Sequence, residues 1–160
     1  MRKMLLSFKP EWHKRIMTGE KTYEYRTNFP DEEILAYMYV SAPVKQIMGI
    51  VHLGRRISLS EWKSKYKDNK LVNERISEFM KKRKYVMPIL SYQHTNGVDL
   101  AKIRNEFPEF VAPQMYFYLD TREEILNYIQ NNLKLTGDLI TNCFDNVDDE
   151  DICRKKYREE

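Results

Sequence analysis

The stretch LLSFKPEWHKRIMTGEKTYEYR, residues 5–26, predicts three secondary-structure elements in a row. Its apolar beginning is typical of a buried strand that ends near Phe8. Pro10 suits the first turn of a helix, because the N–H group that proline lacks would have no partner there. Gly19 ends this helix in the way that a C-terminal glycine commonly does. Residues 22–26 alternate between polar and aromatic side chains, which predicts a second strand.

Three charged residues lie close together at the end of this stretch. Side chains alternate between the two faces of a strand, so Glu24 and Arg26 share one face and lie about 6–7 Å apart. Lys21 directly precedes the strand and can lean over the same face. Two interpretations remain open. The charges form a structural ion pair, which often contributes little stability, or Arg26 offers a planar fork to a phosphate or carboxylate ligand.

These residues carry a resemblance to a known family. The spacing Gly19-x-Lys21-x-x-Glu24-x-Arg26 matches the G-x-K-x-x-E-x-R signature of the ASCH family, within the PUA-like superfamily. The flanking strand, helix and strand resemble the opening of that family, and AYMYVSAPVKQIMGIVHLG (residues 36–54) resembles its next two strands. APQMYFYL (residues 112–119) is similar to its late Pro-Gln-aromatic strand. The resemblance implies a small PUA-like β-barrel with a cleft lined by the signature, to which Gln114 would contribute.

The resemblance implies an RNA-associated binding domain. Some relatives resemble amidohydrolases that deacylate N4-acetylcytidine, and ribonuclease activity has been attributed to others. Lys21 matches the lysine of the hydrolases, but Glu24 stands where they have a threonine. Lys21 and Glu24 are therefore catalytic candidates only if the protein is an enzyme, with Lys21 helping to generate the nucleophile and Glu24 shuttling a proton. A third possibility is a protein-interaction module.

The candidate contacts with RNA or a modified nucleoside combine the signature with residues expected near the cleft. Lys9 and Lys45 would extend its positive rim, and Tyr92 lies in a segment that could border it. Aromatic side chains at such positions stack on unpaired bases, although most aromatics of a strand fill a core. The full set is Lys9, Lys21, Glu24, Arg26, Lys45, Tyr92 and Gln114.

The rest of the chain predicts further strands and helices in alternation. Strands are expected at residues 34–41, 50–58, 85–93 and 112–119, and helices at residues 59–66, 71–83, 99–107 and 122–133. Several connections are too short for a parallel crossover. The predicted class is therefore α+β, with a mixed, largely antiparallel sheet or small barrel decorated by helices. One domain is expected over residues 1–144, followed by a charged, mobile tail at residues 145–160.

Charge is distributed unevenly along the chain. The net charge is only +3, from 27 lysines and arginines against 24 acids. Residues 63–84 hold nine lysines and arginines with three acids, whereas residues 145–160 are acidic overall. The cluster KKRK at residues 81–84 has two interpretations. Cations at a helix C-terminus complement the helix dipole, or the cluster binds phosphate.

Composition excludes several classes of protein. Two cysteines, Cys143 and Cys153, do not make a disulfide framework, which favours a reducing compartment. No apolar run approaches the ~18 residues of a membrane span, so a cytoplasmic protein is expected. The three histidines lack ligand spacing and no glycine-rich phosphate loop is present, so no metal and no cofactor are expected. The oligomeric state is left open.

Overall fold

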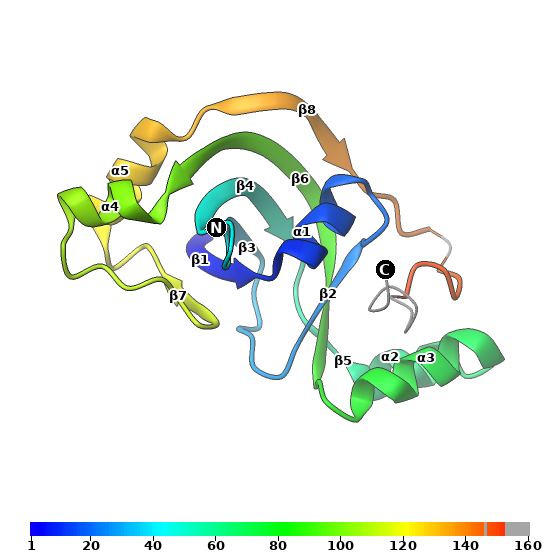
Figure 1. Ribbon diagram of the computed structural model, residues 1–160. Coiled ribbons are helices and arrows are strands. Elements are labelled where there is room, and N and C mark those ends of the chain that lie inside the picture. The colour runs from blue at the N-terminus through cyan, green and yellow to red at the C-terminus, as the bar shows by residue number, and fades with distance from the viewer. Residues whose placement is uncertain (146, 153–160) are drawn as a thin grey trace.

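The computed structural model describes residues 1–145 and 147–152 and shows a curled sheet with helices at both ends (Figure 1). Its eight strands form a half-barrel. The strands are β1 (Arg2–Phe8), β2 (Tyr23–Arg26), β3 (Ile34–Val40), β4 (Gln46–Leu53), β5 (Ile57–Ser58), β6 (Tyr85–Asp99), β7 (Tyr116–Tyr118) and β8 (Leu135–Thr141). The helices are α1 (Pro10–Met17), α2 (Leu59–Lys65), α3 (Lys70–Met80), α4 (Leu100–Glu106) and α5 (Glu123–Asn132).

The strand order confirms the predicted class. The main path of the sheet is β2-β6-β4-β3-β1-β7, and β5 and β8 both pair with β6. β1 and β3 are parallel, while every other pair is antiparallel. The sheet is therefore mixed and largely antiparallel. Because β1 lies between β3 and β7, the ends of three strands from distant parts of the sequence meet beside the start of α1.

The strand β6 is longer than its sequence predicted and organises the sheet. Its first residues pair with β2 and β5, and the remainder pairs with β4 and β8. Pro88 lies near the change of partner, and the register with β4 shifts between His52 and Leu53. Proline lacks the N–H group that a regular ladder needs, so a bulge beside it is expected. A proline within the strand expected at residues 85–93 predicts an edge or a bulge, and the register shift agrees with this expectation.

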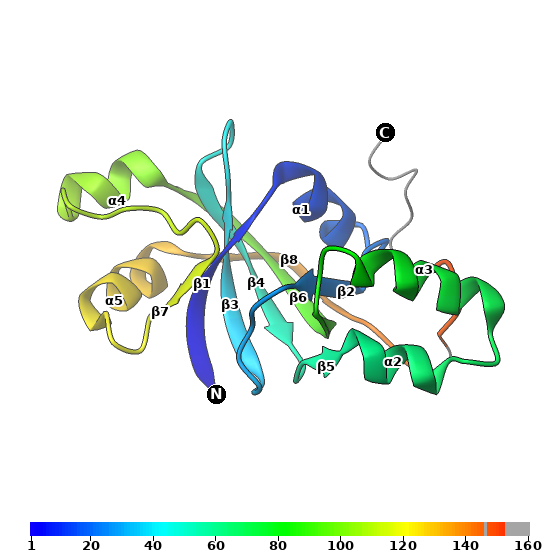
Figure 2. The same ribbon diagram turned by 90° about the horizontal axis from the view of Figure 1, so that it is seen from below.

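Three hydrophobic clusters fill the structure. The first lies between the curled sheet and α1, and includes Met38 and Tyr92. The second packs α4 and α5 against one end of the sheet. The third packs α2 and α3 against β2 through Tyr23, Tyr25 and Trp62. Figure 2 shows the two helical pairs at opposite ends of the sheet. The signature strand β2 therefore lies between the first and third clusters.

Local signals explain some element boundaries and miss others. Ser58 and Glu61 have the spacing of a capping box, which predicts the start of α2. The structure confirms it, because the Ser58 hydroxyl accepts from the Glu61 N–H at 3.2 Å. The same spacing at Thr121 and Glu124 predicts a cap for α5 that is wrong, because Arg122 occupies the N-cap position without a side-chain hydrogen bond. The strand β8 was not predicted, because almost all its residues are exposed and a strand without a buried face shows no alternation.

The chain beyond β8 returns to the third cluster. Ile152 is completely buried there, together with Phe144 and Val147 at its edge. Arg75 on α3 forms an ion pair with Asp149, with 3.0 Å between Nη2 and Oδ2. The domain boundary at residue 144 and the mobility of the tail stay predictions, and residues 146 and 153–160 lie outside the described residues. None of the described helices combines the length and apolar character needed to cross a membrane.

Candidate functional site

The turn between α1 and β2 places the signature. The peptide N–H groups of Thr18 and Gly19 close the last turn of α1 on Lys14 and Ile16. Gly19 has a φ of +80°, a left-handed conformation in which a side chain would be strained. The Lys21 N–H then bonds back to the Arg15 carbonyl at 2.9 Å. The glycine of the signature therefore has a backbone role, because it turns the chain directly from the helix into β2.

Lys21 is held inside the protein. Its side chain is only 5% exposed, and Nζ donates to the Tyr23 carbonyl at 2.6 Å. Nζ also lies 3.4 Å from Oε1 of Glu24. The rings of Trp12 and Tyr25 flank the ammonium group at 5.3 and 5.0 Å from their centroids, a distance at which aromatic faces attract a cation. The buried ammonium group of Lys21 thus stabilises the Glu24 carboxylate by an ion pair inside the protein.

Glu24 lies between two cations, Lys21 and Arg26. Its side chain is 7% exposed, and its carboxylate accepts from the Tyr25 N–H and from Nη2 of Arg26, both at 3.0 Å. Burial by itself raises the pKa of Glu24, but Arg26 and Lys21 lower it by more, so the net pKa lies below its ordinary value. The carboxylate is therefore ionised at neutral pH. The predicted ion pair is present, and it is a triad of two cations around one buried anion.

Arg26 connects this triad to a cavity. Its Nη2 donates to the Ser7 carbonyl at 2.8 Å as well as to Glu24, and its guanidinium carbon lies 5.3 Å from the centroid of the Phe8 ring. These contacts fix the plane of the guanidinium group. Its Nε and Nη1 groups make no hydrogen bond to a described residue. Arginine has five N–H donors in a rigid fork, so part of the fork stays available to a ligand.

The cavity has a volume of about 520 Å³. It is bordered by the end of β1, the start of α1, β2, the end of β3, the chain after α3 and the chain before β7. Its cationic residues are Lys9, Arg26 and Arg83, and its one acid, Glu24, is already neutralised by its neighbours. The lining residues are Ser7, Phe8, Lys9, Trp12, Glu24, Tyr25, Arg26, Thr27, Tyr39, Ser41, Arg83, Pro113, Gln114 and Met115.

Comparison with known families and structures agrees with this architecture. The family model of the ASCH domain matches residues 6–111, which includes the whole signature. The chain belongs to the ASCH domain family. No curated protein matches the chain.

Solved ASCH structures share the fold. The crystal structure of ASCH from Zymomonas mobilis is 21% identical, with a TM-score of 0.62, and the match covers 83% of this chain and 96% of that one. A tyrosine-to-phenylalanine mutant of the same protein gives 20% identity and a TM-score of 0.63 over 84% of this chain and 100% of that one. At this level of identity the likeness shows the fold, which is PUA-like.

The structure of this protein brings together most of the predicted site residues but not all. Lys9, Glu24, Arg26 and Gln114 line the cavity, and Lys21 lies behind Glu24. Lys45 does not line it, because this exposed residue lies in the turn between β3 and β4. Its φ of 53° belongs to that turn.

Tyr92 was expected near the cleft and instead lies in the core. Its side chain is fully buried in the first hydrophobic cluster. Its hydroxyl is 3.2 Å from Nε2 of His13 and 2.8 Å from Nδ1 of His94. Both faces of β6 carry aromatic or aliphatic residues, so the sequence did not indicate which face the curled sheet encloses. Tyr92 packs α1 against the sheet and does not border the ligand cavity.

Ten of the fourteen lining residues were not predicted as site residues, among them Trp12 and Arg83. Trp12 lies in α1, and Arg83 reaches the cavity from the chain after α3. Trp12 precedes Ile16 by four residues, a helical spacing that is equally typical of core residues. Arg83 belongs to the KKRK cluster, so the charge run was the signal that could have found it. The described residues contain no group of three histidines, cysteines or acids that could hold a metal ion.

The pair of histidines around Tyr92 predicts a pH-dependent stability. Burial lowers the pKa of His13 from its ordinary value of 6.5, and His94 lowers it further. The folded protein therefore binds fewer protons here than the unfolded chain. This contribution to the free energy of unfolding should be complete above about pH 6.5 and should decrease as the pH falls through the lowered value.

Urea denaturation of the wild type and of His13→Gln across this pH range tests the expectation. Glutamine does not titrate, so the variant should show a smaller decrease in stability between about pH 7 and pH 5. The same slope in both proteins would contradict the assignment to His13.

Proposed function

We propose that this ASCH domain binds single-stranded RNA in the cavity beside its signature. The observation that supports this proposal most strongly is the incomplete hydrogen bonding of the Arg26 guanidinium group. This group is fixed by Ser7 and Glu24, while the Nε and Nη1 donors have no partner among the described residues. A preorganised, partly unsatisfied arginine fork matches the geometry of a phosphate group. Glu24 would orient this fork, and Lys21 would keep Glu24 ionised.

The remaining lining residues support the same class of ligand. Lys9 and Arg83 add positive charge to the cavity, and Gln114 offers an amide that can donate to and accept from a base edge. Trp12 provides aromatic surface. Proteins that bind single strands combine cations for the backbone with aromatic side chains on which bases stack. The cavity holds both kinds of residue.

The hydrolase alternative has less support. A catalytic lysine must reach the substrate or the attacking water, whereas Lys21 does not line the cavity and donates to the Tyr23 carbonyl. Burial raises the pKa of Glu24, but Arg26 and Lys21 lower it by more, so its carboxylate is a weak base. A general base works best when its pKa lies near the operating pH. RNA binding therefore fits this arrangement better than amide hydrolysis.

Fluorescence anisotropy of a labelled single-stranded RNA at several salt concentrations tests the proposal. Loss of a hydrogen-bonded charge contact costs about 1.5–3 kcal/mol, so Arg26→Ala should weaken binding about 10- to 100-fold. Lys9→Ala, at an exposed position, should reduce the slope of log affinity against log salt by about 0.7. The matched control is Arg55→Ala, which removes an exposed arginine that pairs with Asp31 and does not line the cavity.

Two outcomes would contradict RNA binding at this site. One is an affinity that survives Arg26→Ala and Lys9→Ala, provided that circular dichroism shows both variants folded. The other is no binding by the wild type at low salt. Release of acetate from N4-acetylcytidine that disappears in Lys21→Met would favour the hydrolase alternative.

A further inference from the structure

The chain that follows α3 carries an exposed group of cations. Residues 81–84, here called the basic turn, consist of Lys81, Lys82, Arg83 and Lys84, and all four are exposed. Among the described residues, no acidic side chain forms an ion pair with any of them. The basic turn connects α3 to β6 at the end of the molecule where the α2–α3 hairpin lies (Figure 2). No ion pair with a described residue therefore neutralises its positive charge, although Lys84 lies over the Tyr85 ring and Arg83 donates to the Lys82 carbonyl.

Backbone contacts hold the basic turn against the signature strand. The Lys84 N–H donates to the Arg26 carbonyl at 3.2 Å, and the Thr27 hydroxyl donates to the Lys82 carbonyl at 3.1 Å. On its other side, the Leu59 N–H donates to the Lys84 carbonyl at 2.9 Å. The turn is therefore fixed at the end of β2, directly beside Arg26. Arg83, in its middle, lines the same cavity as Arg26.

Helix capping explains only part of this charge. The interaction of a cation with the helix dipole falls off within the last turn. α3 ends at Met80, so Lys81 and Lys82 are close enough to complement its dipole. The Arg83 N–H still bonds to the Phe79 carbonyl of α3, but the Arg83 side chain lines the cavity. The Lys84 N–H bonds to the Arg26 carbonyl at the end of β2. A function in capping would not require these two cations to lie beside the cavity.

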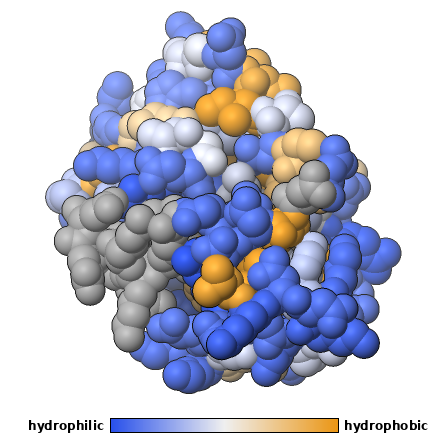
Figure 3. Space-filling model, turned by 90° about the vertical axis from the view of Figure 1, so that its right-hand side faces the viewer, coloured by the Kyte–Doolittle hydropathy of each residue, from blue (hydrophilic) through white to orange (hydrophobic). Residues whose placement is uncertain are grey.

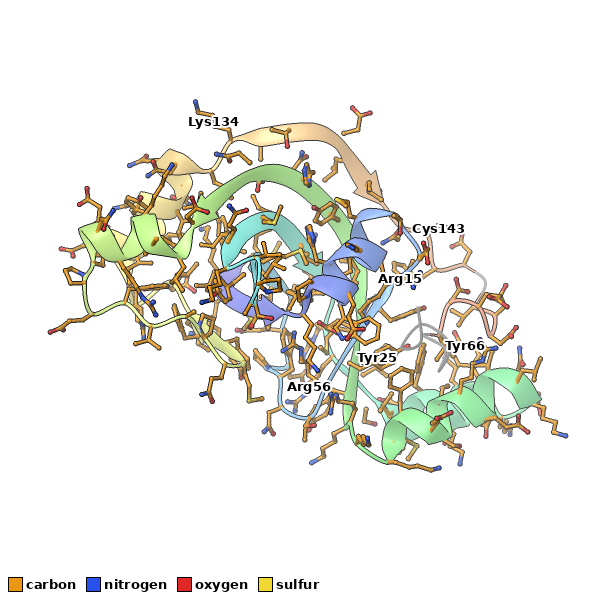
Figure 4. The ribbon with its side chains drawn as sticks, in the orientation of Figure 1. Arg15, Tyr25, Arg56, Tyr66, Lys134 and Cys143 are labelled. Carbon is orange, nitrogen blue, oxygen red and sulfur yellow. The ribbon has the colours of Figure 1, made fainter. Side chains whose placement is uncertain are left out.

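The described acidic residues of the C-terminal segment form no ion pair with the basic turn. Residues 147–152 pack on the same hairpin, where Asp149 pairs with Arg75. That pair neutralises the middle of α3 and not its end. Tyr25, which is labelled in Figure 4, stacks on Phe79 at 3.8 Å between ring centroids, and this contact fixes the last turn of α3 to β2. The side of the molecule on which this hairpin lies is mainly hydrophilic (Figure 3).

We propose that the basic turn is a second phosphate-binding surface, which continues the cavity and follows the RNA strand as it leaves. This inference rests on the proposed function and specifies its ligand. One nucleotide occupies the cavity against Arg26, and the phosphates of the following nucleotides contact Lys81, Lys82 and Lys84. The ligand is therefore a strand of several nucleotides, and a mononucleoside would use only part of the site. A backbone already ordered by hydrogen bonds loses little entropy when the strand binds.

Binding of a short and a long oligonucleotide separates the two surfaces. The probes are a labelled trinucleotide and a labelled decanucleotide of uridine. The decanucleotide lies within the range of about 4–16 nucleotides known for single-strand binding sites, and the trinucleotide is shorter than that range. The test variant is Lys81→Gln/Lys82→Gln/Lys84→Gln, which keeps Arg83 and all backbone contacts. The control variant is Lys65→Gln/Lys67→Gln/Lys70→Gln, which removes the same charge from exposed residues where α2 and α3 meet.

The wild type should bind the decanucleotide more tightly and with a steeper salt dependence than the trinucleotide. The test variant should lose this gain, with its salt slope for the decanucleotide smaller by about 2, while its affinity for the trinucleotide stays unchanged. The control variant should keep the gain. Equal losses in the two variants, or a gain that survives in the test variant, would overturn the inference about the basic turn. Binding of the trinucleotide that depends on Arg26 would still support the proposed function in either case. No binding of either probe by the wild type would overturn both.

Discussion

Replacing Glu24 with alanine should lower the free energy of unfolding by about 3–5 kcal/mol, the usual cost of removing one partner from a buried ion pair. The loss arises from the residue that remains. Lys21 has a 5% exposed side chain enclosed by Trp12 and Tyr25, so its ammonium group cannot recover its hydration without local unfolding. Arg26 would also lose the carboxylate that orients it. Urea denaturation followed by circular dichroism measures the change.

Two companion variants make this expectation specific. In Lys21→Met/Glu24→Leu both buried charges are replaced by apolar groups of similar volume, a change that is often close to neutral. The double variant should therefore regain most of the lost stability. Glu20→Ala removes an exposed glutamate whose partner is Arg15, and its midpoint should stay within the scatter of replicate measurements. A Glu24→Ala protein as stable as the wild type would show that Lys21 is not confined as described.

Replacing Tyr92 with alanine should cost about 3–5 kcal/mol, as for other large aromatic residues removed from a core. The ring is fully buried and packs against the backbone of Gly49, where an added Cβ would lie 2.6 Å from Tyr92 Cε2. Little space exists for the surroundings to collapse into. The hydroxyl also lies between His13 and His94. Thermal unfolding of the purified variant measures the loss.

The Tyr92→Phe variant separates this packing role from a role in ligand binding. It keeps the ring and removes only the hydroxyl, which leaves a nitrogen of buried His13 and a nitrogen of half-buried His94 without their partner, and this should cost about 1–3 kcal/mol. Its affinity for RNA should match that of the wild type, because Tyr92 does not line the cavity. A large loss of RNA affinity in a folded Tyr92→Phe protein would show that Tyr92 belongs to the binding site.

Local patterns in the sequence predicted the beginning of the fold well. Pro10 and Gly19 define both ends of α1 because each acts on the backbone of its own turn. Glu24 and Arg26 were predicted to meet because strand geometry places alternate residues on one face, and they do so at 3.0 Å. Such relations depend on a few neighbouring residues, so one sequence is enough to recognise them.

Residues that depend on distant partners were harder to place. Lys21 was expected to lean over the face of Glu24, but its almost complete burial depends on the packing of α1 against β2. Arg83 lies more than fifty residues from the signature and reaches the cavity only because the basic turn bonds to the end of β2. No local sequence pattern indicates a contact between residues that lie so far apart along the chain.

The sequence by itself determined, through its resemblance to the ASCH family, which kind of domain this is, and its short spacing placed the charged groups of Lys21, Glu24 and Arg26 close together. Only the tertiary structure decided which aromatic and cationic side chains share their cavity. The curl of the sheet encloses Tyr92 and leaves Trp12 at the rim, and β6 brings the basic turn beside Arg26. These outcomes depend on which face of each strand is enclosed, a choice made by packing over the whole chain and not by any one segment.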